Sequence, residues 1–125
     1  MGVKTICYLS FGYPSIEKSI EAAGYYIQGG CDAIEVSLPP KNPYRDSAFI
    51  QNLYKVALEQ CDDYDQYLDG VGRMCDRYPD TEFFLILYHE VIMALGAEKV
   101  GAFCAKHGIH QLISGDLHDE AAIAA

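Results

Sequence analysis

The sequence predicts an α/β fold in which helices cover a parallel sheet. Short apolar runs alternate with longer segments whose apolar residues recur at helical spacing, and glycine or proline turns separate the two kinds of segment. Alternation of this kind is typical of βα units, whose strands lie parallel. The chain has 125 residues and is 50% hydrophobic, so we expect residues 1–125 to form a single domain with its own core.

The first unit is a strand, a helix and a second strand. Residues 5–9 form an apolar run that ends in a Gly-Tyr-Pro turn. Ser15 is a suitable N-cap for the helix, and Gly29 and Gly30 end it. Its inward positions are Ile16, Ile20, Ala23 and Ile27. The second strand is expected at residues 31–36, which completes a βαβ module.

Two helical segments follow a proline-containing loop at residues 39–46. The first is expected over residues 48–60, and the second begins at Asp62 or Asp63. The apolar positions of the first are Phe49, Leu53, Val56 and Ala57. Those of the second are Tyr64, Tyr67, Leu68, Val71, Met74, Cys75 and Tyr78. Two helices in one crossover indicate an insertion into the βα pattern.

The rest of the chain repeats the alternation. Residues 82–88 predict a third strand, followed by a loop or a short turn of helix. Residues 96–107 predict a helix and residues 109–114 a fourth strand, and a further helix is expected from Asp119. This pattern alone fits a small open doubly wound sheet or half of a βα barrel equally well, because a closed barrel of eight units needs about 250 residues.

Charge and hydropathy exclude several classes of protein. A net charge of -9 argues against binding nucleic acid or an anionic membrane, since both need a basic surface. The longest apolar run, residues 83–87, is too short to cross a bilayer, and we expect no signal peptide because no charged segment followed by an apolar run opens the chain. We therefore expect a cytoplasmic protein.

The five cysteines carry no recognisable site. Their number is odd, they are widely spaced, and no C-x-x-C pair or finger-like histidine spacing is present. They are Cys7, Cys31, Cys61, Cys75 and Cys104. We expect reduced thiols that act as small hydrophobic residues.

Two carboxylates are candidates for acid/base chemistry. Glu35 ends an apolar strand, and Asp46 follows eleven residues later in the proline-containing loop. In βα proteins the carboxyl ends of strands and the loops after them meet at one edge, so these groups are expected to converge. A structural role for Glu35, capping a helix or pairing with Lys41 or Arg45, is the alternative.

His89 and Glu90 also invite a functional interpretation. They look like half of a metal or acid/base site, but no second ligand stands three or four residues away. A surface pair on a loop is the better interpretation.

Four segments, in order along the chain, resemble the alpha subunit of tryptophan synthase. They are residues 8–15, 29–36, 39–51 and 85–88. In that family the second strand and its loop read D-A-I-E-L-G-x-P-F-S-D-P-x-A-D-G-P-x-I-Q, and this chain has DAIEVSLPPKNPYRDSAFIQ. The family's first strand ends in a Gly-Asp-Pro-like turn and its third in a tyrosine, which here is Tyr88.

The resemblance implies a fold and an activity. The fold is a (β/α)8 barrel of the TIM type, of which this chain holds about four βα units, a half barrel. The activity is a lyase reaction of tryptophan biosynthesis, the retro-aldol cleavage of indole-3-glycerol phosphate to indole and glyceraldehyde 3-phosphate, with no metal and no organic cofactor. Glu35 falls on the family's catalytic glutamate and Asp46 on its catalytic aspartate. Tyr8 and Tyr88 fall near the wall of the indole-binding site.

The resemblance also implies a partner and shows departures. The family works with a beta subunit, and the loop that contacts it differs here at Asn42, Arg45 and Ser47. The family's phosphate site lies beyond Ala125, so we expect this half to be inactive alone. A non-catalytic half-barrel assembly module or pseudoenzyme is the alternative function. The open sheet edges of a half barrel predict self-association.

Overall fold

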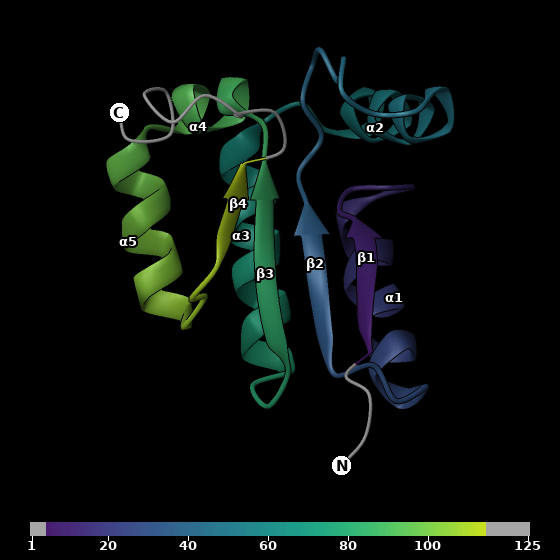
Figure 1. The fold of residues 1–125 in the computed structure, drawn as a ribbon, viewed down its shortest axis with the longest axis vertical. Coiled ribbons are helices and arrows are strands. Elements are labelled where there is room, and N and C mark those ends of the chain that lie inside the picture. The colour runs from purple at the N-terminus through teal and green to yellow at the C-terminus, as the bar shows by residue number, and fades with distance from the viewer. Residues whose placement is uncertain (1–4, 115–125) are drawn as a thin grey trace.

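The structure is a computed structural model, which describes residues 5–114 of the chain. Its centre is a sheet of four strands in the order β1-β2-β3-β4, and each pairs parallel with the next (Figure 1). The strands are β1 (Ile6–Ser10), β2 (Ala33–Ser37), β3 (Glu82–Leu87) and β4 (Leu112–Ser114). The predicted parallel α/β architecture is therefore confirmed, with strand ends that differ from the predicted ones by at most three residues.

Five helices connect the strands among the described residues. They are α1 (Ile16–Gln28), α2 (Ala48–Gln60), α3 (Tyr64–Arg77), α4 (His89–Leu95) and α5 (Ala97–His107). Helix α4 occupies the segment where a loop or a short turn of helix was predicted. The further helix predicted from Asp119 lies outside the described residues.

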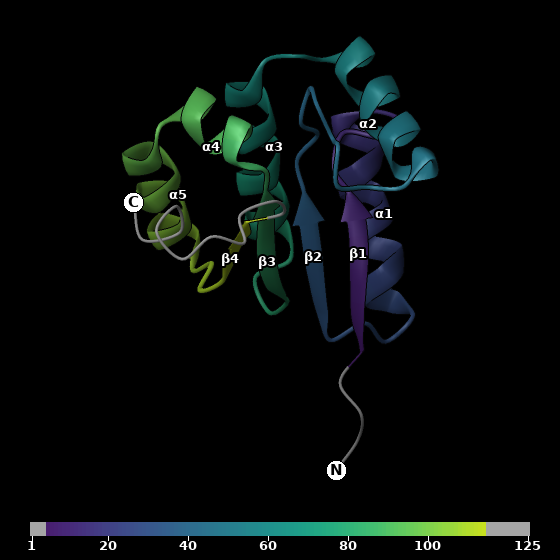
Figure 2. The same cartoon turned by 45° about the horizontal axis from the view of Figure 1, so that its top comes forward.

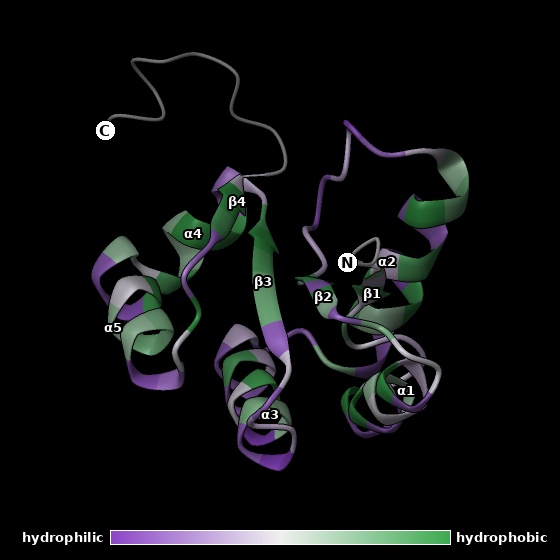
Figure 3. Cartoon of the chain, turned by 60° about the horizontal axis from the view of Figure 1, so that its bottom comes forward, coloured by the Kyte–Doolittle hydropathy of each residue, from purple (hydrophilic) through white to green (hydrophobic). Residues whose placement is uncertain are grey.

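The helices form two groups around the sheet. Helices α1, α3 and α5 run alongside one face of the sheet, whereas α2 and α4 lie beyond the carboxyl ends of the strands (Figures 1 and 2). Seen from below in Figure 3, the first group curves around the strands in an arc. None of the described helices is both long and apolar enough to span a membrane.

The hydrophobic core lies between the sheet and the first group of helices. The strand residues Ile34, Val36, Leu85 and Leu87 all have no exposed surface. They share one cluster with Ile20 and Ala23 of α1, with Tyr67, Leu68, Val71, Met74 and Cys75 of α3, and with Val100 of α5. The inward faces predicted for α1 and α3 are confirmed, because apolar residues at helical spacing seek one buried surface.

Helix α2 differs from its prediction. Phe49, which was expected to point inward, is 72% exposed, and the buried residues of this helix are Tyr54 and Ala57. The prediction was wrong for Phe49, because it used apolar character alone to find the inward face, whereas Ala57 is buried as predicted. Tyr54 defines that face instead, through its hydroxyl group.

The first residues of α1 and α3 follow the predicted capping signals. The Ser15 side chain accepts a hydrogen bond from the Lys18 amide at the start of α1, and Asp63 caps α3 in the same manner. Gly108 ends α5 in the left-handed conformation, with φ of 69°.

The face of the sheet opposite the core carries the polar residues. Strand alternation places Tyr8 and Ser10 of β1 on this face, beside Glu35 and Ser37 of β2. Phe84 pairs with Glu35 from the other side. The sheet therefore separates an apolar, helix-covered face from a face whose carboxyl end is polar.

Candidate active site

Glu35 lies in the middle of the polar face. It is the third residue of β2, is half-buried, and stands in register with Tyr8 of β1 and Phe84 of β3. Within residues 5–114 its carboxylate makes no hydrogen bond or ion pair, so the alternative of a pair with Lys41 or Arg45 is not observed there. This carboxylate is therefore not committed to a structural role by those residues.

Asp46 is held by a tyrosine that directly follows the next strand. The Tyr88 hydroxyl donates to Asp46 Oδ2 at 2.7 Å, and the Arg45 amide donates to the same hydroxyl oxygen at 3.1 Å. Tyr88 directly follows β3 and is 2% exposed, so its position is set by the sheet. The structure thus brings together two of the predicted site residues, Asp46 and Tyr88, although they are 42 positions apart.

Further contacts hold the loop at residues 39–47. Gln51 of α2 donates from Nε2 to the carbonyl oxygens of Pro43 and Asp46, each at 3.0 Å. The Asn42 amide donates to Glu90 Oε1 at 2.7 Å. The interpretation of His89 and Glu90 as a pair on a loop was wrong, because both residues lie in the first turn of α4 and Glu90 binds the loop.

A chain of hydroxyl groups lies next to Glu35. The Tyr54 hydroxyl is 2.7 Å from that of Tyr8 and 2.8 Å from Ser37 Oγ. Tyr54 and Ser37 are almost fully buried, at 2% and 1% exposure. Burial raises the pKa of the Tyr54 hydroxyl, and the hydrogen bond with Ser37 opposes this in part. The group therefore stays protonated at neutral pH.

Sequence reasoning missed both Tyr54 and Ser37. No motif marks them, and their hydrogen bonds join residues 46 and 17 positions apart. The only available signal was that Tyr54 and Ala57 are three positions apart, which places them on one helix face.

We use the name rim for a set of residues on the polar face of β1 and β2 together with residues that lie beyond the carboxyl ends of the strands. The rim consists of Tyr8, Glu35, Ser37, residues 39–47, Tyr54 and Tyr88. All four predicted site residues belong to it. Among residues 5–114, no three His, Cys, Asp or Glu side chains gather closely enough to hold a metal ion.

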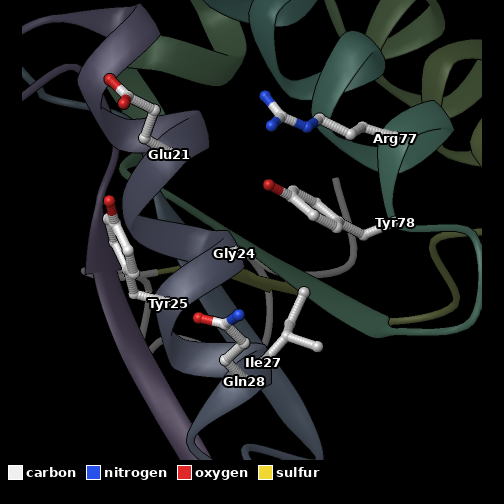
Figure 4. A pocket seen from close by; sticks show the side chains of 7 residues that line it. All are labelled: Glu21, Gly24, Tyr25, Ile27, Gln28, Arg77 and Tyr78. Carbon is white, nitrogen blue, oxygen red and sulfur yellow. The ribbon is translucent and has the colours of Figure 1, made fainter.

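A groove of about 400 Å³ lies elsewhere, between α1 and the end of α3 (Figure 4). It is lined by Glu21, Gly24, Tyr25, Ile27, Gln28, Arg77 and Tyr78. The Tyr78 hydroxyl donates to the Ile20 carbonyl oxygen at 3.4 Å and thereby joins the two helices. None of the predicted site residues lines this groove, so it is separate from the rim.

Comparison with known proteins identifies the family. The family model described as "Tryptophan synthase alpha chain" matches residues 3–124. This chain belongs to the tryptophan synthase alpha chain family. The match covers nearly the whole sequence, and it confirms the resemblance on which the expected roles of the rim residues depend.

Curated and solved relatives agree with this assignment. The tryptophan synthase alpha chain of Aquifex aeolicus is 31% identical over 117 residues, which are 94% of this chain and 45% of that relative. A solved structure from Aquifex aeolicus VF5 is 30% identical with a TM-score of 0.85, and it covers 97% of this chain and 48% of its own. A Mycobacterium tuberculosis tryptophan synthase structure is 27% identical with a TM-score of 0.84. The match covers 98% of this chain and 47% of that one.

The share of each relative that the match covers shows how much of the family's fold this chain contains. This chain spans about half the length of the curated and solved alpha chains that it matches. Together with the four parallel strands, this confirms the prediction of a half barrel.

Proposed function

We propose that this chain supplies the two catalytic carboxylates of an alpha-type lyase. The reaction would be the cleavage of indole-3-glycerol phosphate to indole and glyceraldehyde 3-phosphate. The observation that carries the proposal is the hydrogen bond from Tyr88 to Asp46, which orients a loop carboxylate at the same rim as Glu35. Family membership and the preserved pair of carboxylates support it.

In this proposal Glu35 transfers protons. Cleavage of the bond between indole C3 and the side chain requires a proton at C3 and the loss of the proton from the hydroxyl of the adjacent carbon. The bond electrons return to the ring as that carbon becomes an aldehyde. A half-buried carboxyl without a fixed partner among residues 5–114 can move between the two positions and act as both acid and base.

Asp46 would stabilise the charge that develops on the ring. Protonation at C3 makes the indole nitrogen cationic, and a carboxylate that accepts its N–H lowers the energy of this state. Tyr88 binds Oδ2 of Asp46, which leaves Oδ1 to accept the indole N–H. The rings of Tyr8 and Tyr88 would form the walls around the indole.

The remaining parts of the enzyme would come from outside this chain. The chain covers 45% of the Aquifex aeolicus relative, and we propose that a second half supplies the site for the substrate phosphate. We also propose that the exposed side of the loop, with Lys41 and Arg45, faces a beta subunit. The divergent residues of the loop would then tune that contact and leave the carboxylates in place.

The proposal is tested by completing the barrel. We define the joined chain as this chain followed by the second half of the Aquifex aeolicus alpha chain. We expect it to release indole from indole-3-glycerol phosphate, and Asp46→Asn to lower this rate at least tenfold, since it weakens the stabilisation of the cationic ring. Asp80→Asn, an exposed change remote from the rim, is the matched control. A folded joined chain that releases no indole would contradict the proposal.

A non-catalytic assembly role has its own supporting observation. The outer strands β1 and β4 each have one edge that no described strand pairs, and they expose Ile6 (48%) and Ile113 (37%). Such edges pair readily with another chain. Light scattering of the 125-residue chain should then show dimers or larger species, and a sharp monomer peak would count against this role.

A further inference from the structure

Helix α2 is attached to the sheet in an unusual way. The other helices pack against neighbouring helices or strands over several residues, whereas α2 packs less closely and is joined to α3 by the Tyr67 hydroxyl, which donates to the Ala57 carbonyl oxygen at 3.0 Å. Only Tyr54 and Ala57 of this helix are buried. The Tyr54 hydroxyl makes the direct link to the strands, because it binds Tyr8 of β1 and Ser37 of β2.

The three hydroxyl groups of Tyr8, Tyr54 and Ser37 have more protons than their mutual hydrogen bonds use. Three hydroxyls in a row form two hydrogen bonds, so one of the three protons points out of the chain. When Ser37 donates to Tyr54, and Tyr54 to Tyr8, the outward proton belongs to Tyr8. That hydroxyl is on a residue 38% exposed, in register with Glu35. In this order of donors Tyr8 keeps one hydroxyl proton that neither Tyr54 nor Ser37 accepts, and Tyr8 lies on the strand that pairs with the one carrying Glu35.

The same helix also places the second carboxylate. Gln51 lies one turn before Tyr54 and binds the carbonyl oxygens of Pro43 and Asp46. A shift of α2 therefore moves the backbone of Asp46. Since the Tyr54 hydroxyl binds α2 to the strands, it affects the position of Tyr8 directly and the position of Asp46 through α2 and Gln51.

We propose that Tyr54 is a positioning residue whose hydroxyl holds both the Tyr8 ring and the loop that carries Asp46. It does not touch the substrate. Its effect arises because reacting groups must be held within a fraction of an ångström for efficient catalysis. The part of this inference that concerns ligand binding rests on the lyase function proposed above.

The positioning itself is tested by hydrogen exchange on the 125-residue chain. Tyr54→Phe keeps the ring and removes both hydrogen bonds, and we expect amide exchange over residues 42–60 to accelerate about tenfold, the effect of losing one to two net hydrogen bonds. Exchange in β2 and α1 should stay unchanged. Tyr78→Phe, which removes the bond to the Ile20 carbonyl oxygen on the far side, is the matched control and should leave residues 42–60 unchanged. Unchanged exchange there in Tyr54→Phe would overturn the proposal.

Ligand binding is tested with indole itself. The chain contains no tryptophan, so the fluorescence of added indole can be read without a tryptophan background when it is excited at wavelengths that the ten tyrosines do not absorb. We expect saturable binding by the wild type and about tenfold weaker binding by Tyr54→Phe. The double variant Tyr8→Phe/Tyr54→Phe should lose little more affinity, because both changes remove the same hydrogen bond between the two hydroxyls. Equal affinity of wild type and Tyr54→Phe would overturn the role in binding.

The two measurements separate this inference from the proposed function. Local acceleration of exchange without any indole binding by the wild type would support positioning by Tyr54 and contradict the indole site. If Tyr54→Phe does not fold, Ser37→Ala and Tyr8→Phe each remove one of the two hydrogen bonds. Each should accelerate exchange over residues 42–60 by a smaller factor, and no acceleration in either variant would overturn the proposal.

Discussion

The two faces of the sheet are stabilised by different forces. On the helix side, apolar residues of the strands and of α1, α3 and α5 form one continuous buried cluster. At the rim, single hydrogen bonds from Tyr88, Tyr54 and Gln51 hold a loop and a helix that pack little against the rest. Burial of apolar area is non-directional and strong, whereas a hydrogen bond contributes about 1 kcal/mol but fixes geometry. Stability is therefore expected from the first region and orientation of the carboxylates from the second.

Neighbouring residues of β2 provide the largest expected contrast in stability. Ile34 faces the helices and has no exposed surface, whereas Glu35 faces the rim and is half-buried. Ile34→Ala should lower the free energy of unfolding by about 2–5 kcal/mol, from lost transfer energy and the cavity left behind. Glu35→Gln should change it by less than about 0.5 kcal/mol. Urea unfolding of both variants checks this, and similar losses would remove the distinction between the two faces.

Alkaline pH should weaken the core and the contact between α3 and the loop in different ranges of pH. Burial raises the pKa of the Cys75 thiol in the core from 9.0 to about 11, and that of the Tyr64 hydroxyl, which binds the Pro39 carbonyl oxygen, from 10.0 to about 12. Since the folded-state pKa exceeds the unfolded one, each group contributes stability below its ordinary value that is lost as pH rises toward the folded value. Cys75→Ala should reduce the fall of the unfolding free energy with pH between pH 9.0 and about 11. Tyr64→Phe should reduce it between pH 10.0 and about 12. Unaltered pH profiles in both variants would contradict this account.

The helix caps offer a smaller and closely matched contrast. Ser15 Oγ accepts from the Lys18 amide at 3.2 Å in α1, and Ser47 Oγ accepts from the Ile50 amide at 3.3 Å in α2. Loss of either cap should cost its helix about 1 kcal/mol. Ser15→Ala should lower the global free energy of unfolding, because α1 packs on the core. Ser47→Ala should mainly accelerate amide exchange within α2, and an equal global loss in both variants would show that α2 belongs to the same cooperative unit.

The helix side could be predicted from the sequence, and the rim only in part. Apolar periodicity identified the inward residues of α1 and α3 because one buried surface selects them. The same rule placed Phe49 inward although it is 72% exposed, since α2 contacts the sheet through the Tyr54 hydroxyl. Hydrogen bonds such as the one between Tyr8 and Tyr54, which are 46 positions apart, leave no local pattern.

The candidate site, too, could be predicted from the sequence only in part. Glu35 was predicted from its place at the end of a strand and Asp46 from its place in the following loop, together with the family resemblance. The structure places Glu35 in the middle of β2 and Asp46 in the loop beyond the carboxyl end of that strand. The bond from Tyr88 to Asp46 could not be predicted, because it depends on how the loop folds back onto the end of β3. The roles of Tyr8 and Tyr88 as walls of an indole site stay predictions.

The rate of indole release by the joined chain carrying Glu35→Gln tests the central claim most directly. Glutamine has nearly the same shape as glutamate but cannot transfer the proton. We predict that indole formation from indole-3-glycerol phosphate is abolished while the urea unfolding midpoint stays at the wild-type value. Indole release at the wild-type rate by a folded Glu35→Gln variant would contradict the assignment of the chemistry to the rim.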